Sequence, residues 1–244
     1  EIDYLIGDKV LIPDDYRKYY SEKVLYMPNC YMPFDNKRKI STKKFTKSDF
    51  DLPEDSFVLA AFHQNHKITK KEIYSWSRIL KRLSSSILWI SEMNDEAKSN
   101  LLLFFNKQGI ESKRIHFCKR LDSIEEHLAR HSCADLFIDT FNYNAHSTSI
   151  DALWSGLPVI TLLGESFSAR VSASLLTTLN LTELIANDVS EYEDIIIDLA
   201  NDSKRLKDLK NNLIVSKSNN PLFDSEKYIR EFESLLKGLV EKFN

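Results

Sequence analysis

A polar segment between two apolar stretches has the residue types that hold a diphosphate. Residues 144–148 follow an apolar run and precede a helical pattern. A helix opening at His146, Ser147 and Thr148 would present free backbone N–H groups and a positive dipole end, which bind phosphate without a glycine-rich loop. Asp151 lies one turn further along and could accept hydrogen bonds from ribose hydroxyls. The alternative is a simple Ser/Thr helix cap.

A second polar turn, residues 62–67, follows another apolar run. Lys67 could balance phosphate charge there, and Gln64 could donate a hydrogen bond to a phosphate oxygen. The alternative is a solvated surface lysine, the fate of most lysines. His63 and His66 invite a metal-site interpretation, but no further ligands stand at a suitable spacing, so no metal is predicted.

A third group, His127 and Arg130, has the i, i+3 spacing of one helix face. Their ring and guanidinium could flank a planar base. The alternative is an exposed polar face without a ligand. Of the other histidines, His116 lies in an apolar strand and is predicted to be a hydrogen-bonded core residue, whereas His131 is predicted to lie at the surface.

Charge and hydropathy exclude two broad classes of partner. The 244 residues include 33 Lys and Arg against 36 Asp and Glu, which gives a formal net charge of −3. This balance provides no basic field for a polyanionic backbone, so nucleic-acid binding is not expected. No apolar stretch approaches the roughly 18 residues that a membrane-spanning helix needs, so no membrane partner is expected.

Cysteine and glycine usage exclude several kinds of site. Three cysteines without a C-x-x-C pair predict neither a disulfide framework nor a four-ligand zinc site and favour a reducing cytoplasm. Cys118 and Cys133 are expected to be small buried residues. Both the G-x-G-x-x-G fingerprint and the Walker loop are absent, and no order of residues predicts a nucleophilic triad. The first residue is Glu1 and no secretory leader is visible, so we expect a piece of a longer cytoplasmic protein.

Alternating strand and helix signals from Phe57 onward predict a doubly wound α/β domain with a helical tail. Continuous apolar strands separated by helices indicate a parallel sheet covered on both faces. Ligands in such sheets bind beyond the carboxyl ends of the strands, where all three polar groups fall. The expected strands are 57–62, 87–90, 114–118, 136–139, 159–162 and 183–186, and the expected helices are the one capped by Thr69, then 95–107, 123–131, 146–155, 168–179 and 224–243.

The polar segment and the helix after it resemble a family signature. Residues 144–161 are similar to the signature of the O-linked N-acetylglucosamine transferases, peptide glycosyltransferases usually fused to tetratricopeptide repeats and including SPINDLY-like proteins. The resemblance covers nearly the whole chain. It extends to residues 62–68, 76–89, 164–166, 168–174, 183–186, 191–195 and 220–223, while residues 20–28 resemble the end of that family's N-terminal catalytic lobe.

The resemblance implies an inverting transfer of a sugar, GlcNAc in the first place, from UDP to Ser/Thr hydroxyls of a protein acceptor. It implies no cofactor and no metal. Lys67 would be the catalytic residue that neutralises the departing UDP, and Gln64 would also contact the diphosphate. The other implied UDP contacts are His127 stacked on uracil, Arg130 beside the base, His146, Ser147 and Thr148 at the phosphates, and Asp151 at the ribose.

The family is two-lobed, with the GT-B architecture, and this sets the expected domains. Residues 1–45 would be the tail end of the N-terminal lobe and a linker, 46–220 the Rossmann-like UDP-sugar lobe, and 221–244 a C-terminal helix packing back toward the N-terminal lobe. Most of that lobe, with its acceptor-side histidine, and all repeats lie outside the chain. The chain alone is therefore expected to be inactive or nearly so.

Three departures from the family keep two alternatives open. Ile124 stands where relatives carry a lysine near the ribose, Ser147 replaces a threonine, and Ala145 replaces a glycine. A degenerate UDP-binding or scaffolding module is therefore one alternative. A UDP-sugar epimerase of the same architecture is the other, although it would require catalytic carboxylates at the cleft.

Overall fold

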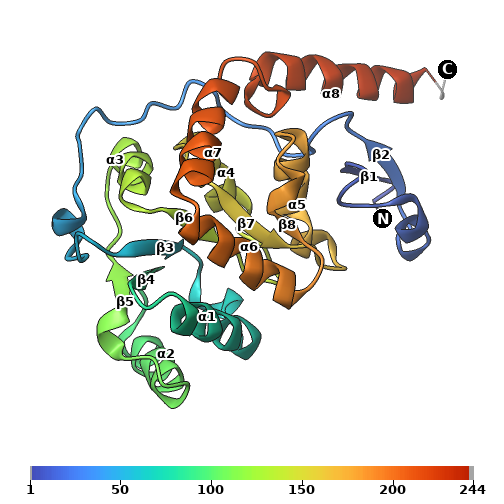
Figure 1. Cartoon of the computed structure of the whole chain (residues 1–244). Coiled ribbons are helices and arrows are strands. Elements are labelled where there is room, and N and C mark those ends of the chain that lie inside the picture. The colour runs from blue at the N-terminus through green and yellow to red at the C-terminus, as the bar shows by residue number, and fades with distance from the viewer. Residues whose placement is uncertain (1, 242–244) are drawn as a thin grey trace.

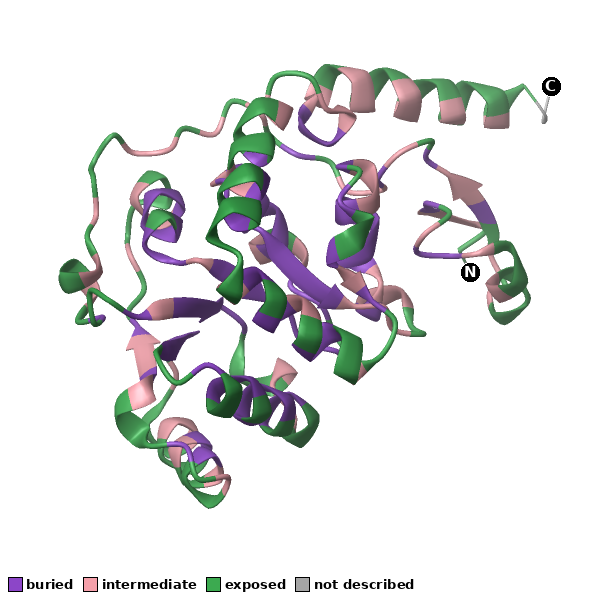
Figure 2. Ribbon diagram, viewed as in Figure 1, coloured by how far each residue is buried: buried purple, intermediate pink, exposed green. Residues whose placement is uncertain are grey.

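The central sheet of the computed structural model, which describes residues 2–241, consists of six parallel strands (Figure 1). Their order is β5-β4-β3-β6-β7-β8, and the central strands are the most deeply buried part of the molecule (Figure 2). This confirms the predicted doubly wound α/β fold. The strands are β3 (Phe57–Ala61), β4 (Ser86–Ser91), β5 (Ile115–Cys118), β6 (Leu136–Ile138), β7 (Val159–Leu162) and β8 (Ile185–Ala186).

Helices cover both faces of this sheet. Contacts group α1 with α2 and α6, and group α4 with α3 and α5, as expected when right-handed crossovers run in opposite directions from the sheet centre. No helix between residues 2 and 241 combines the length and apolarity needed to cross a bilayer. The helices are α1 (Lys70–Arg82), α2 (Asp95–Lys107), α3 (Ile124–Ala129), α4 (His146–Trp154), α5 (Val171–Thr178), α6 (Val189–Asn201), α7 (Ser203–Ser216) and α8 (Ser225–Val240).

The strand order reverses between β3 and β6, and this reversal locates the site. From β3 the chain proceeds outward through β4 to β5, then returns to β6 and proceeds the other way to β8. Loops after neighbouring strands at such a reversal diverge and leave a crevice at the carboxyl edge. The loops in question are residues 62–69 and 139–145, which hold two of the three polar groups.

Most predicted elements are present, with differences at their ends. Thr69 caps α1 together with Glu72, as predicted. At the predicted ends of two helices and one strand, the structure has short 3-10 turns that connect the elements. These turns are Arg130–Cys133 after α3, Phe167–Ala169 before α5 and Thr182–Leu184 before β8. The predicted final helix includes residues 242 and 243, which lie outside the described residues.

The placement of His131 differs from the prediction. Its side chain is 1% exposed, because the 3-10 turn after α3 turns its ring inward against Phe62, at 5.4 Å between ring centroids. His131 Nδ1 donates to the carbonyl of His127 at 3.0 Å. His116 differs from the prediction of a hydrogen-bonded core residue, because it is only half-buried in β5 and its Nε2 has no hydrogen-bond partner among the described residues. Cys118 and Cys133 are buried as predicted.

The segment before residue 34 forms a small unit that packs against Val171 of α5. Its two strands, β1 (Tyr4–Gly7) and β2 (Lys23–Tyr26), pair in parallel. Buried Asp8 joins this unit to the main body, because its carboxylate accepts from the Tyr31 backbone at 3.0 Å and from Ser174 Oγ of α5 at 2.6 Å. α8 extends over the same unit (Figure 1), and its Tyr228 hydroxyl donates to the Tyr31 carbonyl at 2.8 Å.

A buried polar chain ties the α1 and α6 layer to the end of β6. Trp76 and Tyr192 are fully buried. Trp76 Nε1 donates to the Tyr192 hydroxyl at 3.3 Å, and that hydroxyl donates to the Asp139 carbonyl at 3.0 Å. Buried groups of this kind are costly to leave unpaired.

We therefore expect Tyr192→Phe to lower the free energy of unfolding by about 1–3 kcal/mol, because one buried donor and one buried acceptor lose their partner. Urea denaturation followed by circular dichroism measures the change. The matched control is Tyr74→Phe on the exposed side of α1, which should change stability by less than about 0.5 kcal/mol. Equal effects at the two positions would contradict the polar chain.

Candidate functional site

Two buried carboxylates shape the loop after β6. Asp139 Oδ1 accepts from the backbone N–H groups of Thr140 and Ala145, both at 2.8 Å, and its Oδ2 accepts from Thr161 Oγ1 at 2.9 Å. Glu72 of α1 accepts from the Phe141 N–H at 2.8 Å. The loop is thereby held at both ends, and α4 begins directly after it.

Lys67 reaches from the loop after β3 to the loop after β6. Its Nζ donates to the Asn144 carbonyl at 2.9 Å and lies 3.9 Å from the centroid of the Tyr143 ring. Burial lowers the pKa of Lys67, and the charge of Asp139 opposes that shift. The structure thus brings Lys67 next to the start of α4.

The start of α4 presents the three residues predicted to hold phosphate. His146 is half-buried, stacks on Tyr143 with 4.8 Å between ring centroids, and donates from Nε2 to the Ser168 carbonyl at 3.2 Å. Burial lowers the pKa of His146. Ser147 is exposed and Thr148 is half-buried in the same first turn. The first N–H groups of a helix lack intrahelical partners, so this end suits an anion.

Asp151 is the centre of a second ionic cluster. It is 9% exposed, and its Oδ1 pairs with Arg38 Nη1 from the segment before β3. Its Oδ2 lies 3.7 Å from His127 Nε2 of α3. Although burial raises the pKa of Asp151, the combined effect of His127 and Arg38 lowers it below the ordinary value, so the carboxylate is ionised.

Arg130 turns inward from the end of α3. It is 5% exposed, its guanidinium carbon lies 4.7 Å from the Phe62 ring centroid, and Nη1 donates to the Lys119 carbonyl at 2.9 Å. Arg130 therefore fixes the loop after β5. The predicted common helix face of His127 and Arg130 is interrupted, because Arg130 lies in the 3-10 turn after α3 and is buried, and of the two only His127 lies beside Asp151.

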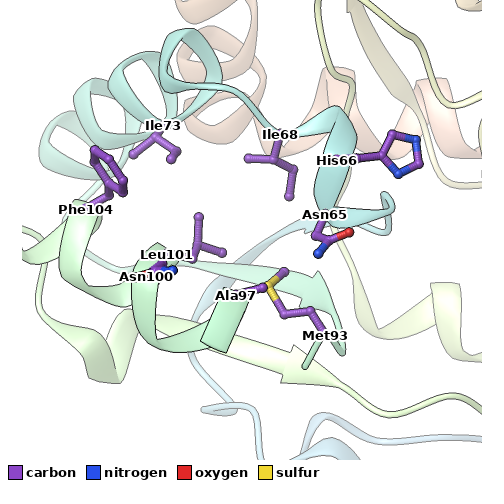
Figure 3. Close-up of a pocket in the computed structure, with 9 residues that line it drawn as sticks. All are labelled: Asn65, His66, Ile68, Ile73, Met93, Ala97, Asn100, Leu101 and Phe104. Atoms are coloured by element: carbon purple, nitrogen blue, oxygen red, sulfur yellow. The ribbon is translucent and has the colours of Figure 1, made fainter. Parts of the chain in front are cut away.

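Gln64 begins the turn that carries Lys67, and a pocket opens beside this turn. The Gln64 side chain is exposed. The pocket has a volume of about 220 Å³ and lies between α1 and α2 (Figure 3). Its wall is mostly apolar and contains no Lys or Arg side chain, so it does not suit a diphosphate. It is lined by Asn65, His66, Ile68, Ile73, Met93, Ala97, Asn100, Leu101 and Phe104.

Metal ligands and reactive thiols do not gather at this crevice. Across residues 2–241, no three His, Cys, Asp or Glu side chains lie close enough together to hold a metal ion. Buried His63 donates from Nε2 to the Ile138 carbonyl at 2.9 Å, which gives it a structural role. Burial raises the pKa of Cys30 to about 12 and that of Cys118 to about 11, so both remain thiols.

The two clusters are spaced along one rigid helix. Asp151 follows His146 by five residues, which corresponds to about 7.5 Å along the α4 axis. An anion at the helix start and a hydroxyl donor at Asp151 can therefore belong to one extended ligand. The sequence patterns did not identify four residues that shape this site: Arg38, Asp139, Glu72 and Tyr143. Only Asp139 gave a signal, as a charged residue ending an apolar strand.

Comparison with known proteins points to one family. The sequence pattern of Glycosyl transferase family 41 matches residues 35–232. A probable UDP-N-acetylglucosamine–peptide N-acetylglucosaminyltransferase of Arabidopsis thaliana, SEC, is 34% identical over 238 residues, covering 95% of this chain and 24% of the relative. A UDP-N-acetylglucosamine–peptide N-acetylglucosaminyltransferase of Caenorhabditis elegans is 30% identical, covering 81% of this chain and 17% of the relative.

A solved structure shares the fold over nearly the whole chain. A mutant O-GlcNAc transferase of Thermobaculum terrenum superposes with a TM-score of 0.83 at 25% identity, covering 95% of this chain and 44% of that one. The chain therefore spans about a quarter or less of the curated relatives named above, and under half of the solved structure.

The buried histidines predict a loss of stability in mild acid. Burial lowers the pKa of His63 to about 4 and that of His131 to about 3. Unfolded histidine titrates near 6.5, so below that pH the unfolded chain binds more protons and the folded state loses stability as the pH falls toward 4. Asp139 has the opposite effect, because burial raises its pKa to about 6. Below pH 6 the folded state takes up this proton before the unfolded chain does, which favours the folded state as the pH falls.

A variant isolates one contribution. Between pH 6.5 and 5, the free energy of unfolding should fall by about 1–2 kcal/mol less in His131→Asn than in the unchanged chain. The reason is that each pH unit is worth about 1.4 kcal/mol per proton taken up on unfolding. Urea unfolding at each pH measures the difference, with His66→Asn on the exposed turn as the control. Parallel pH curves for His131→Asn and the unchanged chain would contradict a buried neutral His131.

Proposed function

Because the chain belongs to Glycosyl transferase family 41, we propose that it is the UDP-sugar-binding part of an inverting protein O-glycosyltransferase. The donor is a UDP-sugar, with GlcNAc as the favoured sugar because the named relatives use UDP-N-acetylglucosamine. The acceptor is a Ser or Thr hydroxyl of a protein. One observation carries the proposal: Lys67 Nζ lies beside the start of α4 at the point where the strand order reverses.

The geometry supports assigning the diphosphate to this point. Lys67 supplies a cation, and the first turn of α4, with His146, Ser147 and Thr148, has no side-chain cap and supplies backbone N–H groups. The N–H of His146 already donates to the Asn144 carbonyl at 3.2 Å, so the N–H groups of Ser147 and Thr148 are the ones proposed for the anion. Gln64 begins the facing turn and extends into solvent. Asp151 stands about 7.5 Å further along α4, at the distance that suits the ribose attached to the diphosphate.

The base would then lie over α3. His127 is partly exposed beside Asp151, so its ring can stack on uracil. Arg130 supports this surface from below by holding the Lys119 carbonyl. We propose that Arg130 contacts the base only through a shift of its guanidinium, since in this structure it faces Phe62.

In the transfer, the acceptor oxygen bonds to the anomeric carbon while the bond from that carbon to the β-phosphate oxygen breaks. The acceptor proton passes to a base outside this chain, and negative charge grows on the leaving UDP. Lys67 and the helix N–H groups are placed to stabilise that charge. The proposed chemistry therefore needs no metal, because cationic and N–H donors serve the leaving group.

The rest of the machinery is proposed to lie in the longer protein. We propose that residues 1–45 end an N-terminal lobe and link it to the 46–220 lobe, and that tetratricopeptide repeats precede both. α8 fits a place against that lobe, because it contains no buried residue and exposes Ile229, Leu236 and Val240.

The three free buried cysteines fit a reducing cytoplasm. A scaffolding module would bind UDP without transfer. An epimerase would need carboxylates available for catalysis, whereas Asp139 and Glu72 are engaged by the loop after β6 and Asp151 by Arg38.

The first test is UDP binding by the chain itself. Calorimetry should detect UDP binding that persists in EDTA, because the proposed ligands of the diphosphate are Lys67 and backbone N–H groups. Asp151→Ala should weaken it by about 1–3 kcal/mol through the lost ribose contact. Unchanged affinity in this variant would remove the ribose assignment. Binding lost in EDTA and restored by Mg²⁺ would remove the phosphate assignment.

The second test concerns catalysis in the full-length protein. Lys67→Ala should lower kcat for peptide glycosylation by on the order of 10²-fold or more, because a charge partner of the transition state is removed. UDP affinity of the same variant should fall less. Lys67→Arg should restore turnover only in part, since a planar fork does not reproduce a compact ammonium. Near-normal turnover of Lys67→Ala would show that another group stabilises UDP.

A further inference from the structure

The segment that joins the β1–β2 unit to β3 lies against the nucleotide side of the lobe. We call residues 34–45 the linker. Its Arg38 carbonyl accepts from Trp154 Nε1 of α4 at 3.3 Å, and its Ser41 N–H donates to the Glu125 carbonyl of α3 at 3.1 Å. The linker thus crosses from α4 to α3 before it reaches the sheet (Figure 1).

From this linker we propose that Arg38 is a positioning residue of the nucleoside site, acting through Asp151. The inference rests on the proposed function, because it takes Asp151 as the ribose ligand. Arg38 Nη1 pairs with one carboxylate oxygen of Asp151, while His127 Nε2 lies 3.7 Å from the other. The carboxylate is therefore held between two elements that are distant in sequence.

The negative charge of Asp151 explains why the site needs a cationic partner at this position. A buried carboxylate is unfavourable when unpaired, and beside an anionic diphosphate it would also repel the ligand. Arg38 neutralises this charge yet engages a single oxygen. An ionised carboxylate has about four acceptor positions, so Asp151 keeps positions for ribose hydroxyls while it is paired.

α3 does not supply this cation. Its first residue, Ile124, is apolar and 63% exposed, and the guanidinium of Arg130 is turned toward Phe62. His127 carries a full charge only when protonated. Of the two described side chains that pair with Asp151, Arg38 is thus the one with a guanidinium, a group that does not lose its proton in proteins.

The position of Arg38 is itself fixed by packing. Its guanidinium carbon lies 5.9 Å from the Phe34 ring centroid, and Phe34 packs on Trp154 at 4.8 Å between ring centroids. The side chain of Arg38 is partly exposed, so a substitution there opens no core cavity. Loss of Arg38 therefore opens no cavity, but it leaves a buried carboxylate without its cation, so the stability of the variant is measured together with ligand binding.

The test measures the Kd for UDP of the full 244-residue chain by calorimetry at neutral pH. Arg38→Ala should raise Kd about tenfold, the scale of one lost charged hydrogen bond, and Arg38→Lys should recover part of the loss. The matched control is Lys43→Ala, which removes the same charge from the linker at an exposed pair with Glu126 and should stay within about twofold. Thermal melts confirm that each variant is folded.

A double-mutant cycle separates positioning from a general structural effect. If Arg38 acts through Asp151, Arg38→Ala should add little to the Kd of Asp151→Asn, because the partner is already changed. Additive effects would overturn the proposal. Tighter UDP binding by Arg38→Ala would also overturn it, because Arg38 would then compete with the ribose.

The outcomes also separate this inference from the proposed function. No UDP binding by the unchanged chain, or no effect of Asp151→Asn, would contradict the proposed function and its ribose assignment. A weakened Asp151→Asn together with an unaffected Arg38→Ala would contradict the role of Arg38 alone.

Discussion

The candidate site depends on one buried carboxylate. Asp139 ends β6 in an apolar interior, where desolvation raises its pKa to about 6, and hydrogen bonds, among them those from Thr140, Ala145 and Thr161, oppose that shift. These bonds close the loop from Thr140 to Ala145 into a single shape, and the loop shape determines where α4 begins. The Asn144 carbonyl that receives Lys67 belongs to the same loop. One charge at the end of one strand thus positions both the helix terminus and the lysine.

The sequence predicted the architecture well because burial on both faces leaves a clear trace. Strands such as β3 and β7 are continuous apolar runs, and α1 has both an apolar stripe and a capping box at Thr69. The pattern was weaker where short turns replace regular elements. His131 looked like a surface residue, because the 3-10 turn that rotates its ring inward has no periodic signature.

The site was predicted in part, for a similar reason. Helix-start residues and the lysine after β3 follow from strand, loop and helix order, since the carboxyl ends of parallel strands meet at one edge. Partners that come from elsewhere in the chain leave no such trace. Arg38 lies in a polar linker among several lysines, and nothing in its spacing indicates that it pairs with Asp151, which is 113 positions away. Tyr143 likewise gains significance only from its contact with Lys67.

The two clusters on α4, one at its first turn and one at Asp151, lie at a fixed separation along a single helix. An α-helix has a fixed rise per residue, so the rise along the α4 axis from His146 to Asp151 is fixed at about 7.5 Å. A ligand gains from both ends only if its own anionic group and its hydroxyls are separated by a matching length. Free pyrophosphate, which has no hydroxyl groups of a sugar, could engage only the first turn. Under the proposed assignment of phosphate and ribose, the spacing along α4 would therefore select ligands by their length.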